Sequence, residues 1–132
     1  MLDAALSFEP RPVAVAGVEL GGCSLASAVS LVSHQRGRGE LDAIYVRKTP
    51  KDHGSQRLLE GDTKLADGAH VVVVEDVITT GGSTLAAVEK LRARHLVVVG
   101  VVVLVDRLEG GRENLEGAGL RVRALFDRSA FE

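Results

Sequence analysis

The stretch that most constrains the fold is residues 71–84, which read VVVVEDVITTGGST. Four consecutive valines without polar alternation predict a strand buried on both faces, as in a parallel sheet covered by helices. Two acids, Glu75 and Asp76, follow where that strand is expected to end, and a helical pattern begins at residue 85. Since parallel strands are joined by crossover helices, this stretch by itself predicts an α/β fold.

The loop between the predicted strand and helix consists of small residues that suit a phosphate. Gly81 and Gly82 let backbone N–H groups approach an anion without a Cβ in the way. A helix N-terminus favours negative charge, and four hydroxyl donors stand beside it; these are Thr79, Thr80, Ser83 and Thr84. The two carboxylates suit sugar hydroxyls, or a divalent cation that phosphates already hold.

The rest of the chain alternates between strand and helix patterns. Strands are expected at residues 13–17, 41–48, 71–74, 96–107 and 120–127, and helices at 2–8, 23–33 and 85–95. Gly21 and Gly22 predict a tight turn, residues 49–62 a long exposed loop or hairpin, and residues 109–119 a surface loop with about one helical turn. We therefore expect one α/β domain, residues 1–132, with a mostly parallel, twisted sheet flanked by helices.

Ligands of such sheets bind at the carboxyl ends of the strands. Three loops, at residues 19–22, 75–84 and 106–107, begin at such ends in the predicted order. The sequence thus predicts that they meet in one site.

Composition limits the class of protein and its partners. The 132 residues are 45% apolar but only 3% aromatic, so the core must be built from Val, Leu and Ala. A net charge of −2 gives no general basic field for nucleic acid. One cysteine excludes an internal disulfide and suits a reducing compartment, and the longest apolar run, residues 96–105, is too short to span a bilayer as a helix. We expect a cytoplasmic protein without nucleic-acid or membrane partners.

The motif EDVITTGGST after four valines resembles the phosphoribosyl-diphosphate (PRPP) binding motif of the type I phosphoribosyltransferases. Three further segments resemble the orotate phosphoribosyltransferase branch of that family. Its flexible catalytic loop is similar to residues 47–54, RKTPKDHG, and its pyrophosphate turn is similar to residues 17–22, GVELGG. The segment that meets the orotate carboxylate in that branch is similar to residues 105–111, VDRLEGG. The resemblance covers about residues 13–127 and implies the type I phosphoribosyltransferase fold.

The resemblance also implies a role for each matching residue. Glu75 and Asp76 would hold the ribose hydroxyls of PRPP, and Arg107, with Thr79, would meet the base. The 5-phosphate would lie in a cradle made by Thr79, Thr80, Gly81, Gly82 and Ser83. The pyrophosphate turn would be Glu19, Leu20 and Gly21, and the catalytic cations would be Arg47, Lys48, Lys51 and His53.

The implied reaction is transfer of the phosphoribosyl group from PRPP to orotate, a step of pyrimidine nucleotide biosynthesis. Mg²⁺ would be the cofactor, held mainly by PRPP, with Asp76 as a ligand through water. A homodimer is expected, in which residues 47–54 reach the partner's site.

Family members usually carry a hood of lysine and aromatic residues over the base ahead of the first strand. Here twelve residues precede Val13, and Phe8 is the only aromatic among them. Two alternatives therefore stay open: a phosphoribosyltransferase for another base, and a non-catalytic regulatory protein that binds PRPP. Without PRPP chemistry, Arg107 would simply pair with Asp106 or Glu109, and Cys23 would be a small buried hydrophobe.

Overall fold

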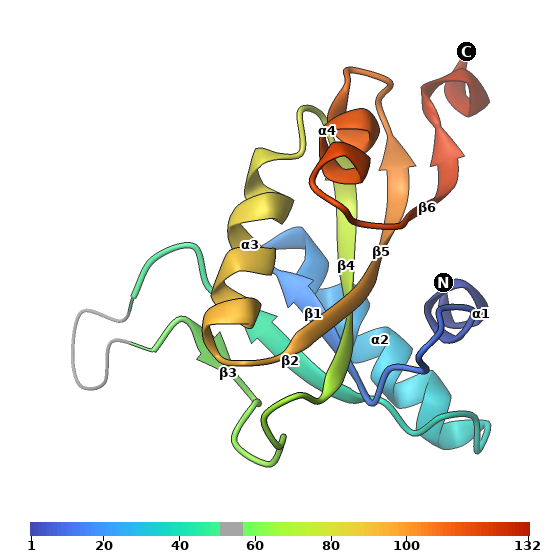
Figure 1. Cartoon of the computed structure of the whole chain (residues 1–132). Coiled ribbons are helices and arrows are strands. Elements are labelled where there is room, and N and C mark those ends of the chain that lie inside the picture. Colours follow the sequence, from blue (N-terminus) through green and yellow to red (C-terminus); the bar gives the residue numbers. More distant parts are fainter. Residues whose placement is uncertain (51–56) are drawn as a thin grey trace.

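The computed structural model describes residues 1–50 and 57–132, and within them the strands form one mixed sheet. Its strand order is β3-β2-β1-β4-β5-β6 (Figure 1). The strands are β1 (Ala14–Val18), β2 (Asp42–Val46), β3 (Leu59–Glu60), β4 (His70–Ile78), β5 (Val97–Asp106) and β6 (Val122–Asp127). All neighbouring pairs are parallel except β2 with β3, which forms an antiparallel edge. The expected α/β class with a mostly parallel sheet is confirmed.

Helices cover both faces of this sheet. They are α1 (Leu2–Leu6), α2 (Gly21–Gln35), α3 (Gly82–Ala93), α4 (Gly111–Gly117) and the short 3-10 helix η1 (Arg128–Phe131). In Figure 1, α3 and α4 lie on one side of the strands, and α1 and α2 on the other. The apolar residues divide accordingly into two clusters, one beneath α3 and α4 and one beneath α1 and α2.

The four valines of β4 supply both clusters. Val71 and Val73 belong to the cluster beneath α3, whereas Val72 and Val74 belong to the cluster beneath α2. All four are fully buried. Successive side chains of a strand point to opposite faces, so an unbroken apolar run is what a strand covered on both sides requires.

The boundaries around the central loop differ from the sequence-based expectation. Strand β4 continues through Glu75 and Asp76 to Ile78, because β5 is long enough to pair with it up to the Ile78–Asp106 register. Helix α3 begins at Gly82 rather than at residue 85. Gly81 adopts a left-handed conformation with φ 89°, and its carbonyl accepts the first helical bond from the Leu85 N–H at 2.9 Å.

Two further expectations were wrong. Gly21 and Gly22 do not form a turn but open helix α2, since the turn lies earlier, at the cis peptide bond between Glu19 and Leu20. The segment 109–119 was expected to be mainly loop, yet residues Gly111–Gly117 form helix α4. Leu115 explains the difference, because its side chain is fully buried and ties the short helix to the core.

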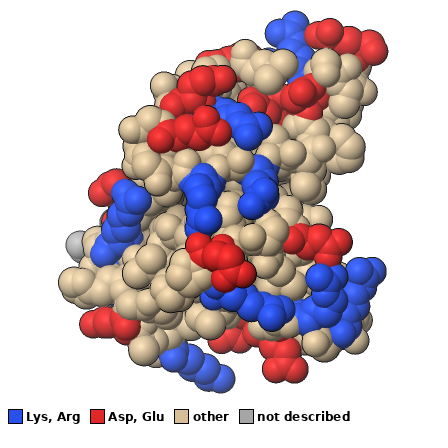
Figure 2. Space-filling model, turned by 45° about the vertical axis from the view of Figure 1, so that its right-hand side comes forward, with Lys and Arg blue, Asp and Glu red and all other residues tan. Residues whose placement is uncertain are grey.

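Charged side chains of both signs lie on the surface. On the face shown in Figure 2, acidic and basic side chains both occur, and several basic side chains lie together toward the lower right. In the part of the chain that the structure describes, no helix is long and apolar enough to cross a bilayer.

Candidate active site

The carboxyl ends of β1, β2, β4 and β5 lie at one edge of the sheet because these strands are parallel. The register pairs Val18 with Val46 at the ends of β1 and β2, and Ile78 with Asp106 at the ends of β4 and β5. The segments after these strands are therefore neighbours, as the sequence predicted. These segments, together with Glu75 and Asp76 near the end of β4, carry the predicted site residues within the described ranges. Lys51 and His53 lie outside those ranges.

The predicted phosphate cradle lies between the end of β4 and the first turn of α3. It surrounds a hollow of about 70 Å³ lined by Glu75 and residues 77–84. The N–H groups of Gly82, Ser83 and Thr84 are the first of helix α3 and have no carbonyl one turn earlier to accept them. Such N–H groups, together with the helix dipole, make the hollow attractive to an anion.

Helix α4 contacts this cradle and supports its backbone, which the sequence analysis did not predict. Asn114 Nδ2 donates a hydrogen bond of 2.8 Å to the carbonyl oxygen of Thr80. At the start of the same helix, a Cβ on Gly111 would lie 2.6 Å from the carbonyl oxygen of Thr79, so only glycine permits this approach. The paired glycines at residues 110–111 were the available signal, but they were attributed to a surface loop.

Thr84, one of the four hydroxyl donors expected beside the phosphate, faces inward instead. Thr84 is buried, and its Oγ1 donates to Glu75 Oε2 at 3.4 Å. The Glu75 side chain is only slightly exposed, at 6%, and its Oε1 accepts from the Asp76 N–H at 3.2 Å. Thr84 thus connects the acid pair to the first turn of α3 rather than extending the phosphate contacts.

Burial raises the pKa of the Glu75 carboxyl to about 8, and the neighbouring Asp76 carboxylate adds to the rise. The raised pKa favours the protonated form of Glu75. A protonated carboxyl can donate as well as accept a hydrogen bond, which suits a ribose hydroxyl.

The other acid lies against the first turn of α2. Asp76 is partly exposed, and its Oδ1 accepts from the Val77 N–H at 2.8 Å. A Cβ on Gly21 would lie only 2.0 Å from Asp76 Oδ2. The absent side chain at Gly21 therefore makes room for the Asp76 carboxylate, which joins the predicted pyrophosphate turn to the predicted ribose site.

The turn after β1 is connected to the basic segment after β2. Glu19 Oε1 accepts a 2.8 Å hydrogen bond from the Lys48 N–H, and the Glu19 N–H donates to the Val46 carbonyl at 2.9 Å. Leu20, the residue after Glu19, is 80% exposed. The predicted pyrophosphate turn and two of the predicted cations, Arg47 and Lys48, are thus held side by side.

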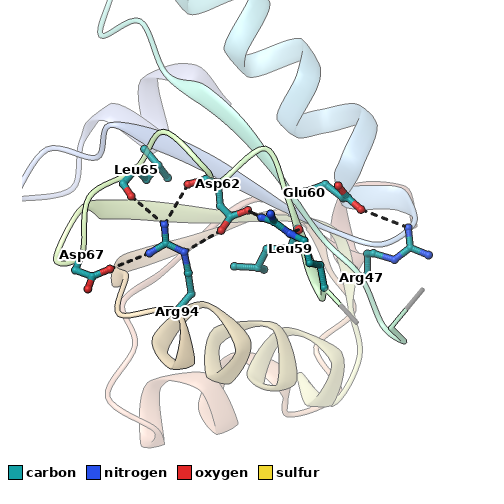
Figure 3. A network of polar contacts seen from close by, with 8 residues as sticks. Arg47, Leu59, Glu60, Asp62, Leu65, Asp67 and Arg94 are labelled. Carbon is teal, nitrogen blue, oxygen red and sulfur yellow. Dashed lines mark hydrogen bonds and ion pairs between the residues drawn. The ribbon is translucent and has the colours of Figure 1, made fainter. Parts of the chain in front are cut away.

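A polar network fixes the returning edge strand β3 to the C-terminal end of α3 (Figure 3). Asp62, whose side chain is 4% exposed, accepts from Arg94 Nε at 2.9 Å and also pairs with Arg57. Arg94 additionally pairs with Asp67 at 2.9 Å and donates to the Leu65 carbonyl at 2.9 Å. The sequence analysis did not predict this network.

Arg107, the predicted base contact, lies at the expected edge of the sheet, but its side chain is paired with an acidic residue. The Arg107 N–H donates to the Ile78 carbonyl at 3.2 Å, which places Arg107 beside Thr79. Its side chain is 54% exposed and pairs with Glu109 at 3.2 Å, one of the two partners that the sequence suggested.

Phe8 does not cover this region. Its ring is fully buried against Gly100, where a Cβ would lie 2.3 Å from the ring. The guanidinium carbons of Arg121 and Arg123 lie 5.3 and 4.8 Å from its centroid. The aromatic residue therefore anchors the N-terminal segment to β5 and β6.

Among residues 1–50 and 57–132, no group of three or more His, Cys, Asp or Glu side chains could hold a metal ion. The partly exposed Asp76 carboxylate can still contact a hydrated cation. This donor set fits Mg²⁺, which keeps several waters and commonly takes its other ligands from substrate phosphates.

Comparison with known proteins places this site in a family. The sequence profile of the phosphoribosyl transferase domain matches residues 3–118. The chain belongs to the phosphoribosyltransferase family. An orotate phosphoribosyltransferase of Sorangium cellulosum is 64% identical over 127 residues, which are 96% of this chain and 66% of that protein. Another, from Methanocaldococcus jannaschii, is 48% identical over 109 residues, which are 83% of this chain and 57% of that protein.

A solved structure shares the fold and the family. The crystal structure of Mycobacterium tuberculosis orotate phosphoribosyltransferase in complex with PRPP superimposes with a TM-score of 0.77 at 36% identity. The match covers 94% of this chain and 68% of that one. The expected type I phosphoribosyltransferase fold is thereby confirmed, and the chain spans about two thirds or less of the length of the two curated relatives described above.

Proposed function

We propose that this chain carries the PRPP site of an orotate phosphoribosyltransferase. The enzyme would form a bond between a ring nitrogen of orotate and C1 of PRPP, break the bond from C1 to pyrophosphate, and release orotidine 5′-monophosphate. One observation carries the proposal: a single hollow is lined by Glu75 and by the loop that precedes α3. A ribose 5-phosphate needs this combination of a hydroxyl-binding carboxyl and an anion cradle.

Substrate binding would divide between that hollow and the adjoining Asp76 carboxylate. The backbone N–H groups and hydroxyls of Thr79, Thr80, Gly81, Gly82 and Ser83 would bind the 5-phosphate. Glu75 and Asp76 would bind the ribose hydroxyls, the protonated Glu75 being able to donate. The diphosphate would then lie toward Asp76 and the turn at Glu19, Leu20 and Gly21, because Gly21 lies directly against Asp76.

The catalytic requirement is to stabilise charge as the bond to pyrophosphate breaks. Positive charge grows on the ribose ring and negative charge on the leaving group, so preorganised cations lower the barrier. The Lys48 N–H donates to Glu19 of the pyrophosphate turn. The preceding residue, Arg47, pairs with Glu60 at 4.0 Å. From the sequence resemblance, Lys51 and His53 would complete this set, and either could give a proton to the departing oxygen.

Mg²⁺ would enter with PRPP and help to neutralise the diphosphate. Asp76 would contact its hydration shell and keep the diphosphate aligned with the ribose.

On the base side, Arg107 would leave Glu109 to meet the orotate carboxylate, beside Thr79. Arg107 can exchange one carboxylate partner for another at little cost because an exposed ion pair contributes little stability. We further propose a cytoplasmic homodimer in which residues 47–54 reach the partner's site; the similarity to orotate phosphoribosyltransferases supports this.

The test is loss of orotate absorbance when PRPP and Mg²⁺ are added, measured on the protein with any additional segments that its gene encodes. Absorbance that stays constant while calorimetry detects PRPP would favour the non-catalytic alternative. Thermal-shift measurements with PRPP, Mg²⁺ and a panel of bases would reveal an enzyme specific for another base. Failure to bind PRPP at all would overturn the proposal.

A further inference from the structure

Lys90 lies two turns into helix α3 and has not been assigned above to any substrate group. Its Nζ donates to two successive backbone carbonyls across the sheet edge, that of Arg47 at 2.9 Å and that of Lys48 at 3.1 Å. These are the two described cations of the proposed pyrophosphate side. An ammonium group that binds two consecutive carbonyls fixes the path of the backbone between them, because both peptide planes are then oriented.

The same segment is held from the opposite side by the turn after β1. The Lys48 N–H donates to Glu19 Oε1 at 2.8 Å, so Lys48 is bound through its N–H by Glu19 and through its carbonyl by Lys90. The Arg47 N–H donates to the Leu58 carbonyl at 2.7 Å. The Glu19 and Lys90 contacts extend this restraint to Lys48.

Lys90 also connects this segment to the phosphate cradle. A hollow of about 330 Å³ is lined by the ends of β1 and β2, by Arg47, Lys48 and Lys90, and by Gly82 and Ser83 at the start of α3. Helix α3 therefore presents its N-terminus to the proposed 5-phosphate site and, two turns later, holds the backbone of the proposed pyrophosphate cations. Because a helix is a rigid rod, it fixes the distance between the two anion-binding parts.

We propose that Lys90 is a positioning residue, which fixes the distance of Arg47 and Lys48 from the phosphate cradle. PRPP requires a defined distance there because it carries phosphates at both ends. This inference rests on the proposed function and deepens it. Lys90 acts through the backbone of the basic segment and does not itself bind the substrate.

The experiment compares two ligands that differ in the pyrophosphate group. Calorimetry would measure PRPP, with Mg²⁺, and ribose 5-phosphate on the wild type and on Lys90→Met, which keeps the aliphatic stem and removes the donor. We expect about tenfold weaker binding of PRPP, the order of effect of losing two charge-assisted hydrogen bonds, and unchanged binding of ribose 5-phosphate. Lys90→Arg, which keeps the charge and donors, should restore most of the PRPP affinity.

A matched control makes the same chemical change elsewhere. Lys64 is exposed in the segment between β3 and β4, and Lys64→Met should leave both affinities unchanged. Equal weakening of both ligands by Lys90→Met would overturn the inference, because it would indicate general damage to the fold or to the cradle. Unchanged PRPP binding by Lys90→Met would overturn it as well.

A double-mutant cycle separates positioning from direct contact. In a background carrying Arg47→Met and Lys48→Met, Lys90→Met should weaken PRPP binding less than about twofold, since the side chains through which it acts are gone. A full tenfold effect in that background would mean that Lys90 binds the substrate directly, against the inference. Failure of the proposed function is distinguishable, because the wild type would then not bind PRPP.

Discussion

The carboxylate of Asp76 occupies the space that a side chain on Gly21 would take. A Cβ built on Gly21 would lie 2.0 Å from Asp76 Oδ2 and 2.4 Å from its carboxyl carbon. One residue opens helix α2 and the other lies near the end of β4, more than fifty positions apart in the sequence. This contact joins the proposed ribose and pyrophosphate parts of the site, and it can be tested by adding one methyl group.

Gly21→Ala should weaken PRPP binding by about tenfold or more, because the new Cβ forces the Asp76 carboxylate out of its position. The free energy of unfolding should change little, since the displaced group is partly exposed and alanine favours the helix. Calorimetry with PRPP and urea unfolding would measure the two effects. Gly117→Ala, where a Cβ has open space, is the matched control and should change neither PRPP binding nor the fold. Equal PRPP affinity in Gly21→Ala would show that the position of Asp76 is unimportant.

Asp76→Asn keeps the shape of the side chain and removes its charge. We expect PRPP to bind about tenfold more weakly in the presence of Mg²⁺, because a hydrated cation loses a charged acceptor, and a smaller effect without Mg²⁺. Titrations with and without the metal would measure this difference. Asp42→Asn is the control, because Asp42 lies exposed at the start of β2, at the other end of the strands from the site. This variant should bind PRPP like the wild type. If Asp76→Asn also binds normally, the acid pair has another role.

Glu75 makes stability depend on pH in a predictable direction. Its pKa is about 8 in the folded protein and near 4.5 when exposed, so the folded state binds the proton more tightly. The stability that this proton confers is fully present below about pH 4.5 and is lost as the pH rises toward 8. Glu75→Gln should therefore flatten the pH dependence of the unfolding free energy, by roughly 2–4 kcal/mol between pH 5 and 8.5. Urea unfolding across that range would measure it, and parallel curves for the two proteins would contradict the assignment.

Asn114→Ala should loosen the phosphate cradle. The Asn114 side chain donates to the Thr80 carbonyl at 2.8 Å, and the loss of one such bond costs about 1 kcal/mol. We expect ribose 5-phosphate to bind about threefold to fivefold more weakly, as measured by calorimetry. Glu113→Ala alters the neighbouring exposed residue on α4 and should have no effect. An unaltered affinity in Asn114→Ala would mean that the cradle keeps its shape without α4.

The catalytic role of the basic loop rests on the sequence resemblance, because Lys51 lies outside the described residues. Lys51→Ala should lower turnover by about a hundredfold or more while PRPP still binds, as expected for a cation that stabilises the transition state more than the substrate. Steady-state kinetics with orotate and calorimetry with PRPP would separate the two quantities, and Lys64→Ala is the control. Normal turnover would remove this loop from the mechanism.

The sequence by itself determined the class of fold, the central strand and the edge where the site lies. These follow from local patterns: the unbroken valines of β4 demand cover on both faces, and Gly81 permits the left-handed turn that starts α3. Side chains at the ends of parallel strands must then meet, so Glu75, Asp76 and the cradle could be assigned to one site before any coordinates.

Only the tertiary structure decided how those parts are held together. The contacts that hold the site together all join residues far apart in the chain. They are the contact between Gly21 and Asp76, the hydrogen bond from Asn114 to Thr80, the hydrogen bonds from Lys90 and the Asp62–Arg94 network. No local pattern encodes such pairs, because each depends on strand register and on the direction in which a helix crosses the sheet. The same reason explains the boundary errors: β4 extends through its acids because β5 pairs with it, and α4 forms because Leu115 finds a place in the core.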